Sequence, residues 1–269
     1  MRPLWFLALW GAAACLGQTE AAPKISAERF LSHVKFLASE ELCGRATGSA
    51  ELERAGRYIA DEFRAYGLVP VGGSYFQWFP VGTDVALGQA NELQYCFGAD
   101  CIALELGKDF IPLNFSGSGE CQGTPVFAGY GISAPELGYD DYSNISVEGR
   151  VVIVLRHEPQ EFDDQSVFAG RIYTEHSQPF SKAIEAARRG ACAVVMVNDV
   201  ANHGGQAGSL EEFVGTVAPA DPGIPFVQVH ADVARRWFRL AGQSLDEIEK
   251  RIDAKLQPMS FTLPASLKL

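Results

Sequence analysis

The 269-residue sequence lacks a strict glycine repeat, low-complexity segments and internal repeats, while 47% of its residues are hydrophobic. These features exclude collagen-like and disordered proteins. It also lacks any run rich in lysine and arginine, and 33 acidic against 22 basic residues give a formal net charge of -11. Because such a surface repels phosphate backbones, we expect no nucleic-acid binding. No stretch beyond the N-terminus has about 18 consecutive apolar residues, so we expect no transmembrane helix.

The N-terminal residues are typical of an export signal. Arg2 supplies a positive charge, residues 4–14 are apolar and small residues follow, with cleavage expected after Gly17 or Ala21. We therefore expect residues 1–21 to be a signal peptide and the protein to be secreted or held in the periplasm or cell envelope. A second interpretation is a lipoprotein signal at residues 12–15, in which Cys15 carries a lipid anchor.

Cysteines are few, and none forms a Cys-x-x-Cys pair of the kind that builds zinc ribbons. Export would leave an odd number that can pair in an oxidising compartment. Cys96 and Cys101 flank a predicted hairpin tip, where a disulfide and two free thiols are both open interpretations. The cysteines beyond the signal are Cys43, Cys96, Cys101, Cys121 and Cys192.

The first part of the chain shows helical spacing followed by weakly alternating strands. Apolar residues three and four apart predict helices over about residues 24–38 and 52–66, with Ser26 as an N-cap and Gly67 as a stop. Strands are predicted at residues 75–80, 92–97 and 101–106.

The second half predicts a parallel sheet. Residues 150–155 and 192–197 are continuous apolar runs typical of strands buried on both faces, and a helix over residues 180–189 lies between them. This order is a βαβ unit, so the fold class is mixed α/β. The remaining predictions are a strand at 224–229, helices from about 232 and from Ser244 to 254, and a strand at 261–269.

No catalytic motif emerges from the sequence. His-Glu-x-x-His, Gly-x-Ser-x-Gly and the glycine-rich phosphate motifs are all absent, and residues 114–119 are expected to be a glycine-serine loop. His230 and Asp232 follow a strand and could offer two zinc ligands. We favour Asp232 as a helix N-cap instead, because no further histidine follows residue 230.

The other polar candidates also favour ordinary structural roles. Four histidines have no partner at ligand spacing and are expected in solvent or in the core: His33, His157, His176 and His203. Two aspartate pairs lack the spacing of a calcium loop and are expected in solvated turns: Asp140 with Asp141, and Asp163 with Asp164. Asn114 and Asn144 are glycosylation acceptors in a host that modifies such sites. We therefore expect no catalytic, cofactor-binding or metal-binding residue in this chain.

Two stretches resemble a known family. Residues 30–49, which read FLSHVKFLASEELCGRATGS, with residues 55–67 following, resemble the opening of exported zinc-dependent aminopeptidases of metallopeptidase family 28, with Cys43 where an acid is common. Residues 126–132 (VFAGYGI), 139–142 (YDDY) and 149–154 (GRVVIV) are similar to the protease-associated (PA) domain inserted in those enzymes, and residues 182–197 and 224–229 continue the pattern.

The resemblance implies a division at residues 1–21 (signal), 22–88 (N-terminal segment of an aminopeptidase-like domain), 89–255 (PA-like domain) and 256–269 (truncated strand or tail). In that family the ligands of two zinc ions follow the PA domain, so none is carried over to this chain. The two N-terminal helices would be left with an incomplete core.

The expected function is therefore a non-catalytic substrate-access or protein-interaction module with a peptide or protein partner. Two alternatives stay open. In the first, this chain is part of an active zinc aminopeptidase that holds two zinc ions. A downstream or separate domain would then complete the enzyme. The other is a degraded gene product.

Overall fold

The computed structural model describes residues 25–80, 82, 84–203, 208–215 and 221–269. The expected signal peptide and Cys15 lie outside these residues. The chain divides into two compact units, Met1–Pro80 and Val81–Leu269, which are described separately below as unit 1 and unit 2. Helices and strands are both present, so the mixed α/β class is confirmed. Within the described ranges, no helix has both the length and the apolar character that a membrane span requires.

Unit 1 is built from two capped helices. Helix α1 (Ala27–Leu37) begins at Ser26, whose hydroxyl accepts the Arg29 amide, and α2 (Ala50–Ala65) begins in the same way at Ser49. The 3-10 helix η1 (Glu40–Arg45) lies between them. Both helices were predicted, but the strand predicted at residues 75–80 is wrong. That segment is irregular, because the described part of unit 1 offers it no strand to pair with beyond one isolated bridge at residues 71 and 74.

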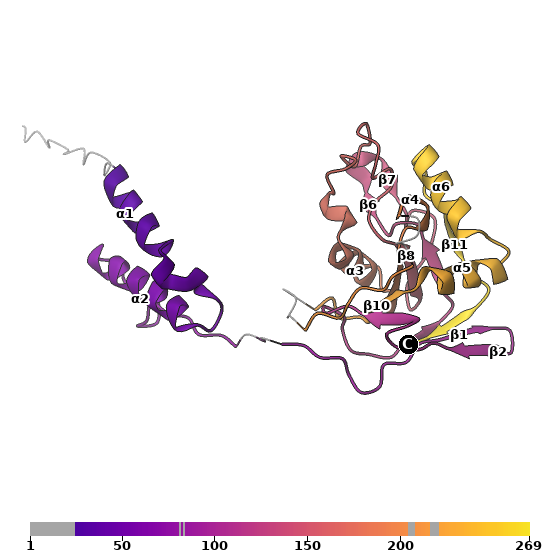
Figure 1. The fold of residues 1–269 in the computed structure, drawn as a ribbon, viewed down its shortest axis with the longest axis horizontal. Helices are drawn as coiled ribbons and strands as arrows, with labels where there is room; N and C mark the ends of the chain where they lie inside the picture. The colour runs from indigo at the N-terminus through magenta and orange to yellow at the C-terminus, as the bar shows by residue number, and fades with distance from the viewer. Residues whose placement is uncertain (1–24, 81, 83, 204–207, 216–220) are drawn as a thin grey trace, which may run out of the picture. The chain divides into compact units, whose positions relative to one another are not determined.

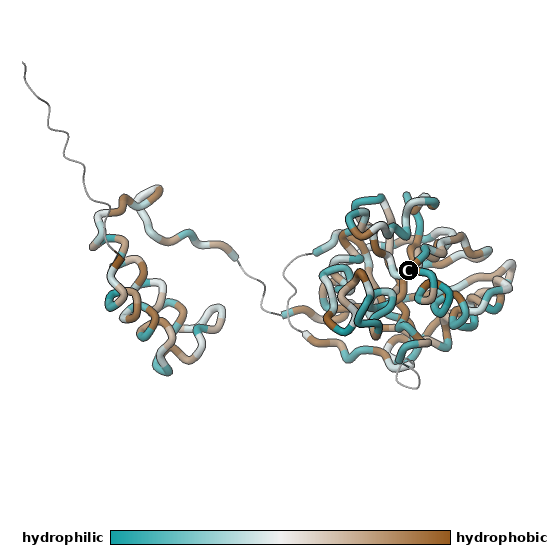
Figure 2. The backbone as a smooth tube through the Cα atoms, turned by 90° about the horizontal axis from the view of Figure 1, so that it is seen from above, coloured by the Kyte–Doolittle hydropathy of each residue, from teal (hydrophilic) through white to brown (hydrophobic). Residues whose placement is uncertain are grey.

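The helices of unit 1 expose apolar side chains. Helix α1 buries none of its residues, and α2 buries only Ala55 and Ala60. Phe30 is 64% exposed, and Val34, Ile59 and Phe63 are also exposed. Figure 2 shows hydrophobic stretches interleaved with hydrophilic ones along these helices. Among the described residues of unit 1, these apolar side chains thus have little cover.

Unit 2 is organised around a six-stranded sheet. Its order is β11-β5-β8-β9-β10-β3, in which the four central strands are parallel and both edge strands are antiparallel to their neighbours. The predicted strands at 150–155, 192–197 and 224–229 are confirmed. In chain order the strands are β3 (Phe110–Pro112), β5 (Val126–Ala128), β8 (Val151–Leu155), β9 (Ala193–Val197), β10 (Phe226–Val229) and β11 (Ser260–Thr262).

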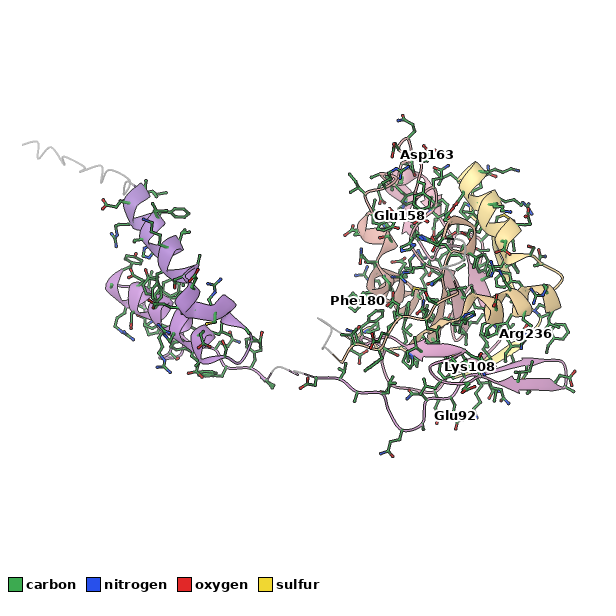
Figure 3. The ribbon with its side chains drawn as sticks, in the orientation of Figure 1. Glu92, Lys108, Glu158, Asp163, Phe180 and Arg236 are labelled. Carbon is green, nitrogen blue, oxygen red and sulfur yellow. A yellow bond between two sulfur atoms is a disulfide. The ribbon has the colours of Figure 1, made fainter. Side chains whose placement is uncertain are left out.

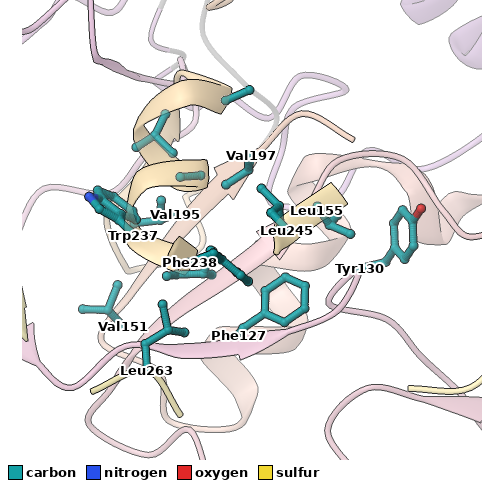
Figure 4. Close-up of a cluster of buried hydrophobic side chains, with 14 of the residues drawn as sticks. Phe127, Tyr130, Val151, Leu155, Val195, Val197, Trp237, Phe238, Leu245 and Leu263 are labelled. Atoms are coloured by element: carbon teal, nitrogen blue, oxygen red, sulfur yellow. The ribbon is translucent and has the colours of Figure 1, made fainter. Parts of the chain in front are cut away.

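Alternate residues of each central strand bury opposite faces of this sheet. Val152 and Val154 pack in one cluster with alanines of α3 (Pro179–Arg188), which covers one face. Val151, Ile153 and Leu155 pack in a second cluster with α5 (Ala231–Leu240) and α6 (Leu245–Lys255), on the other face. Figure 1 shows α3 on one side of β8 and α5 and α6 on the other, and Figure 4 shows Trp237 and Phe238 packed near Val151, Val195 and Phe127. Every residue of β8 and β9 is buried, as the continuous apolar runs predicted.

The C-terminal residues complete both major sheets. Strand β11 pairs with β5, and β12 (Ser266–Lys268) lies between β1 and β4 in a four-stranded antiparallel sheet of order β2-β1-β12-β4. Residues 256–269, expected to be a truncated strand or tail, instead contain two paired strands, whose partners lie between residues 94 and 128. The other elements are β1 (Gln94–Phe97), β2 (Asp100–Ala103), β4 (Gln122–Gly123), β6 (Ser133–Ala134), η2 (Pro135–Leu137), β7 (Tyr139–Asp140), η3 (Glu175–Ser177) and α4 (Val200–His203).

Two disulfides crosslink unit 2. Cys96 and Cys101 pair across the β1-β2 hairpin, which decides between the two interpretations left open by the sequence. Cys121 and Cys192, 71 residues apart, form a second bridge that the sequence did not suggest. Cys43 is free and exposed.

The two disulfides should differ in their contribution to stability. A crosslink stabilises chiefly by restricting the unfolded chain, so replacing Cys121 and Cys192 by alanine should lower the free energy of unfolding by about 4 kcal/mol. The same change at Cys96 and Cys101, only five residues apart, should cost about 2 kcal/mol. Urea unfolding of the two double variants measures the difference. Equal losses would show that loop length does not govern these crosslinks.

Candidate functional site

Four ionisable side chains meet where β8 and β9 end. His157 and Glu161 follow β8, and Asp199 and His203 follow β9, each pair four residues apart. One potential ligand atom from each residue lies within 4.8 Å of all the others. Because β8 and β9 are adjacent parallel strands, their carboxyl ends lie side by side, and both pairs lie at that end of the sheet. These four residues are called the His-Asp-Glu cluster below.

The cluster lies at one end of unit 2. Glu158 and Asp163, which bracket Glu161 in sequence, lie at the end of the unit opposite Lys108 and Glu92 in Figure 3. This is the end at which the central parallel strands terminate, away from the four-stranded antiparallel sheet.

The two histidines bridge the two carboxylates. His157 Nδ1 lies 3.0 Å from both oxygens of Asp199 and 3.4 Å from Glu161 Oε2. His203 Nε2 lies 2.8 Å from Glu161 Oε1 and 3.4 Å from Asp199 Oδ2. The imidazole rings have centroids 4.8 Å apart, and one nitrogen of each ring lies within 4.8 Å of a carboxylate oxygen of both Glu161 and Asp199.

Burial makes this arrangement electrostatically costly. The side chains of Glu161 and Asp199 are 0% exposed, whereas those of His157 and His203 are 18% and 28% exposed. Burial and the neighbouring charge of Asp199 raise the pKa of Glu161 above its ordinary value. Glu161 Oε1 and His203 Nε2, although close, are buried without a correctly directed hydrogen bond.

Helix α6 holds the backbone that carries Asp199 and His203. The Glu249 carboxylate accepts the amides of Val200, Ala201 and Asn202 at 2.8, 2.9 and 3.3 Å. Asp253 accepts the side-chain amide of Asn202 at 3.0 Å. Burial and the charge of Asp199 raise the pKa of Glu249 to about 8, and burial also raises that of Asp253.

The loop that carries His157 and Glu161 is held by other buried groups. Lys182 of α3 is fully buried and donates to the backbone oxygens of His157, at 2.6 Å, and Tyr130. Tyr173 donates to Glu161 Oε2 at 2.8 Å and stacks on the His157 ring with centroids 4.8 Å apart. Burial lowers the pKa of Lys182 to about 7.

His230 and Asp232, the two possible zinc ligands named from the sequence, lie at the start of α5. His230 and not Asp232 is the N-cap of α5, since its Nδ1 accepts the Asp232 amide at 3.2 Å. Asp232 is exposed and pairs with Arg235. The favoured Asp232 cap is therefore wrong, because His230 in extended conformation already occupies the cap position.

Residues 114–119 form a loop, as predicted. Ser116 Oγ donates to the Gly117 carbonyl and accepts the Phe226 amide at 2.8 Å. This loop contributes to the lining of a cavity of about 370 Å³ together with residues of β3 and β10. The hydroxyl is thus engaged with the backbone and has no base among these contacts.

Among the aspartate pairs, Asp163 and Asp164 lie in an exposed turn as expected. Asp141 differs from the expectation of a solvated turn, because it is buried and accepts from Ile132 N and Tyr139 Oη at 3.1 and 2.8 Å. Burial raises the pKa of Asp141 to about 7. Asn144 is exposed, and its glycosylation stays a prediction.

Of the four histidines expected to lack partners, His157 and His203 do have partners at ligand spacing. His33 lies between Tyr58 and Tyr66, and His176 contacts Glu136 at 3.2 Å. His157 and His203 instead share the His-Asp-Glu cluster, which was not predicted from the sequence. The available signal was a histidine and an acid four residues apart after each of two predicted parallel strands.

Residues 118–237 match the PA domain family. No curated protein sequence matches the chain significantly. Among solved structures, an aminopeptidase from Aneurinibacillus sp. strain AM-1 overlaps with a TM-score of 0.34 and 16% identity, covering 90% of this chain and 43% of that one. The zinc aminopeptidase BSAP from Bacillus subtilis gives a TM-score of 0.31 and 16% identity, covering 88% and 42%. The chain contains a PA domain and spans less than half the length of either aminopeptidase.

Lys182 offers a test of how the loop after β8 is held. Lys182→Met keeps most of the side-chain volume but leaves the Tyr130 and His157 carbonyls without their donor, so the free energy of unfolding should fall by about 2–4 kcal/mol. The matched control is Lys250→Met, which removes only an exposed pair with Glu247 and should cost less than about 0.5 kcal/mol. Urea unfolding compares them, and a neutral Lys182→Met would contradict the role assigned to this lysine.

Proposed function

We propose that this chain is the non-catalytic N-terminal portion of an exported zinc aminopeptidase-like protein, in which the PA domain controls substrate access or contacts a protein partner. The PA domain at residues 118–237 is the observation that carries this proposal. The PA domain follows an N-terminal stretch that resembles the opening of metallopeptidase family 28, and this order supports the peptidase assignment.

Export is supported by two features. The N-terminal 21 residues are typical of a signal peptide, and four of the five cysteines beyond them form disulfides. Disulfides persist in oxidising compartments. We accordingly propose a secreted or cell-envelope location.

A second candidate function rests on unit 1. Phe30, Val34, Ile59 and Phe63 expose apolar surface that the described residues of unit 1 do not cover. This surface favours a peptidase domain that supplies the cover, either further along a longer chain or from a separate polypeptide. The complete protein would then be an active aminopeptidase that binds two zinc ions, and the present chain would position its substrate.

The isolated chain should release no amino acid from aminoacyl-p-nitroanilides, with or without added zinc, because the resemblance carries no catalytic residue into it. An aminopeptidase of known activity serves as the positive control in the same assay. Turnover that a chelator abolishes would contradict the non-catalytic assignment.

The intact mass of the protein purified from its natural source separates the two candidates. A mass above the 29.1 kDa of this chain would favour the active aminopeptidase if the difference corresponds to about 150–200 further residues, which is the size of another domain. A mass near 29.1 kDa, less the signal peptide, would favour a non-catalytic module that corresponds to the N-terminal portion of such an enzyme and acts without its peptidase domain.

A further inference from the structure

We infer that the His-Asp-Glu cluster binds one Zn²⁺ ion as a structural site within the PA domain. This goes beyond the proposed function, because the two zinc ions of the aminopeptidase family are expected outside this chain. It also departs from the expectation, drawn from spacing alone, that the chain holds no metal ligand.

The ligand set fits zinc in both type and number. Structural zinc sites have four protein ligands in tetrahedral geometry, drawn from cysteine, histidine and carboxylate side chains. His157 and His203 offer nitrogens, while Glu161 and Asp199 offer oxygens. Calcium and magnesium favour sites built wholly from oxygen, so two imidazoles select against them.

The distances also fit. Bonds of about 2.0–2.1 Å at tetrahedral angles place neighbouring ligand atoms about 3.3–3.4 Å apart. Asp199 Oδ2 lies 3.0 Å from His157 Nδ1 and 3.4 Å from His203 Nε2, and Glu161 Oε1 lies 2.8 Å from His203 Nε2. One ligand atom from each of the four residues lies within 4.8 Å of the others, so small side-chain rotations would bring the set to ligand spacing.

Two buried polar atoms of the cluster, Glu161 Oε1 and His203 Nε2, have no hydrogen-bond partner among the described residues. Glu161 Oε1 and His203 Nε2 lie 2.8 Å apart, yet neither is aligned for a hydrogen bond. Two groups that point past each other are expected where both point toward a third atom. A divalent cation at that position would satisfy both and would neutralise the adjacent buried charges of Glu161 and Asp199.

The surrounding contacts hold the ligands in place before an ion arrives. Tyr173 donates to Glu161 Oε2, and Lys182 holds the His157 backbone. Glu249 holds the turn between Asp199 and His203 through three amides. Such supporting contacts orient ligands in metal sites and are needed for tight binding. The bound ion would join the loop after β8 to α4, and would so stabilise the carboxyl-terminal end of the sheet.

The test uses the untagged 269-residue chain, stripped of metal with a chelator and dialysed. Titration with Zn²⁺ should show one equivalent bound per chain, and excess zinc should raise Tm by about 5 °C or more. Co²⁺ should give the intense visible bands of a four-coordinate site, and zinc should remove them.

Variants identify the site. Glu161→Gln and His203→Gln should each weaken zinc binding at least about tenfold, whereas His176→Gln, a matched histidine of the same unit that contacts Glu136, should bind as the unchanged chain does. Far-UV circular dichroism verifies folding of each variant. The unchanged chain itself decides the question if a variant fails to fold.

Several results would overturn the inference. No zinc binding by the folded chain would leave the cluster as a network of ion pairs. Zinc binding with six-coordinate Co²⁺ spectra, or binding that survives both Glu161→Gln and His203→Gln, would place the metal elsewhere.

Discussion

The burial of β8 and β9 on both faces determines where polar chemistry can occur in unit 2. Their ten residues are all buried, with α3 covering one face and α5 and α6 the other. Polar side chains cannot point from these strands without losing their hydration. The loops beyond the carboxyl ends are the first positions where such side chains find partners, and the His-Asp-Glu cluster lies there.

Because both faces of β8 and β9 are covered, several charged side chains are buried around the loops at the carboxyl ends of these strands. Glu249 and Asp253 of α6 hold α4, and Lys182 of α3 holds the loop after β8. The two helical layers therefore do more than cover the sheet. Each contributes charged side chains that hold one of the two loops at the carboxyl ends of β8 and β9. A cation between the loops completes this arrangement, since the cluster brings together two buried carboxylates.

The elements whose character is set locally could be predicted from the sequence. The apolar runs of β8, β9 and β10, and the cap at Ser26, are local signals, and the structure confirms them. Features set by pairing between distant segments could not be predicted. The Cys121–Cys192 bridge depends on which strands are neighbours, and residues 75–80 do not form a strand because none of the described residues pairs with them.

The candidate site was missed for the same reason. Each histidine lies close in sequence to one acid, but the four-residue set exists only once β8 and β9 are adjacent and parallel. The sequence contained both halves of the cluster, and only the strand order joined them. His230 illustrates the converse, because a plausible pair of ligands in sequence proved to be a helix cap.

Adjacent parallel strands bring His157, Glu161, Asp199 and His203 together, and these four residues are inferred to be the ligands of one ion. The decisive measurement is anomalous diffraction from a crystal of the zinc-loaded chain, recorded on both sides of the zinc absorption edge. We expect one anomalous peak bonded to two imidazole nitrogens and two carboxylate oxygens from these residues. A chain with the same fold and no peak at this position, or a peak held by other side chains, would contradict it.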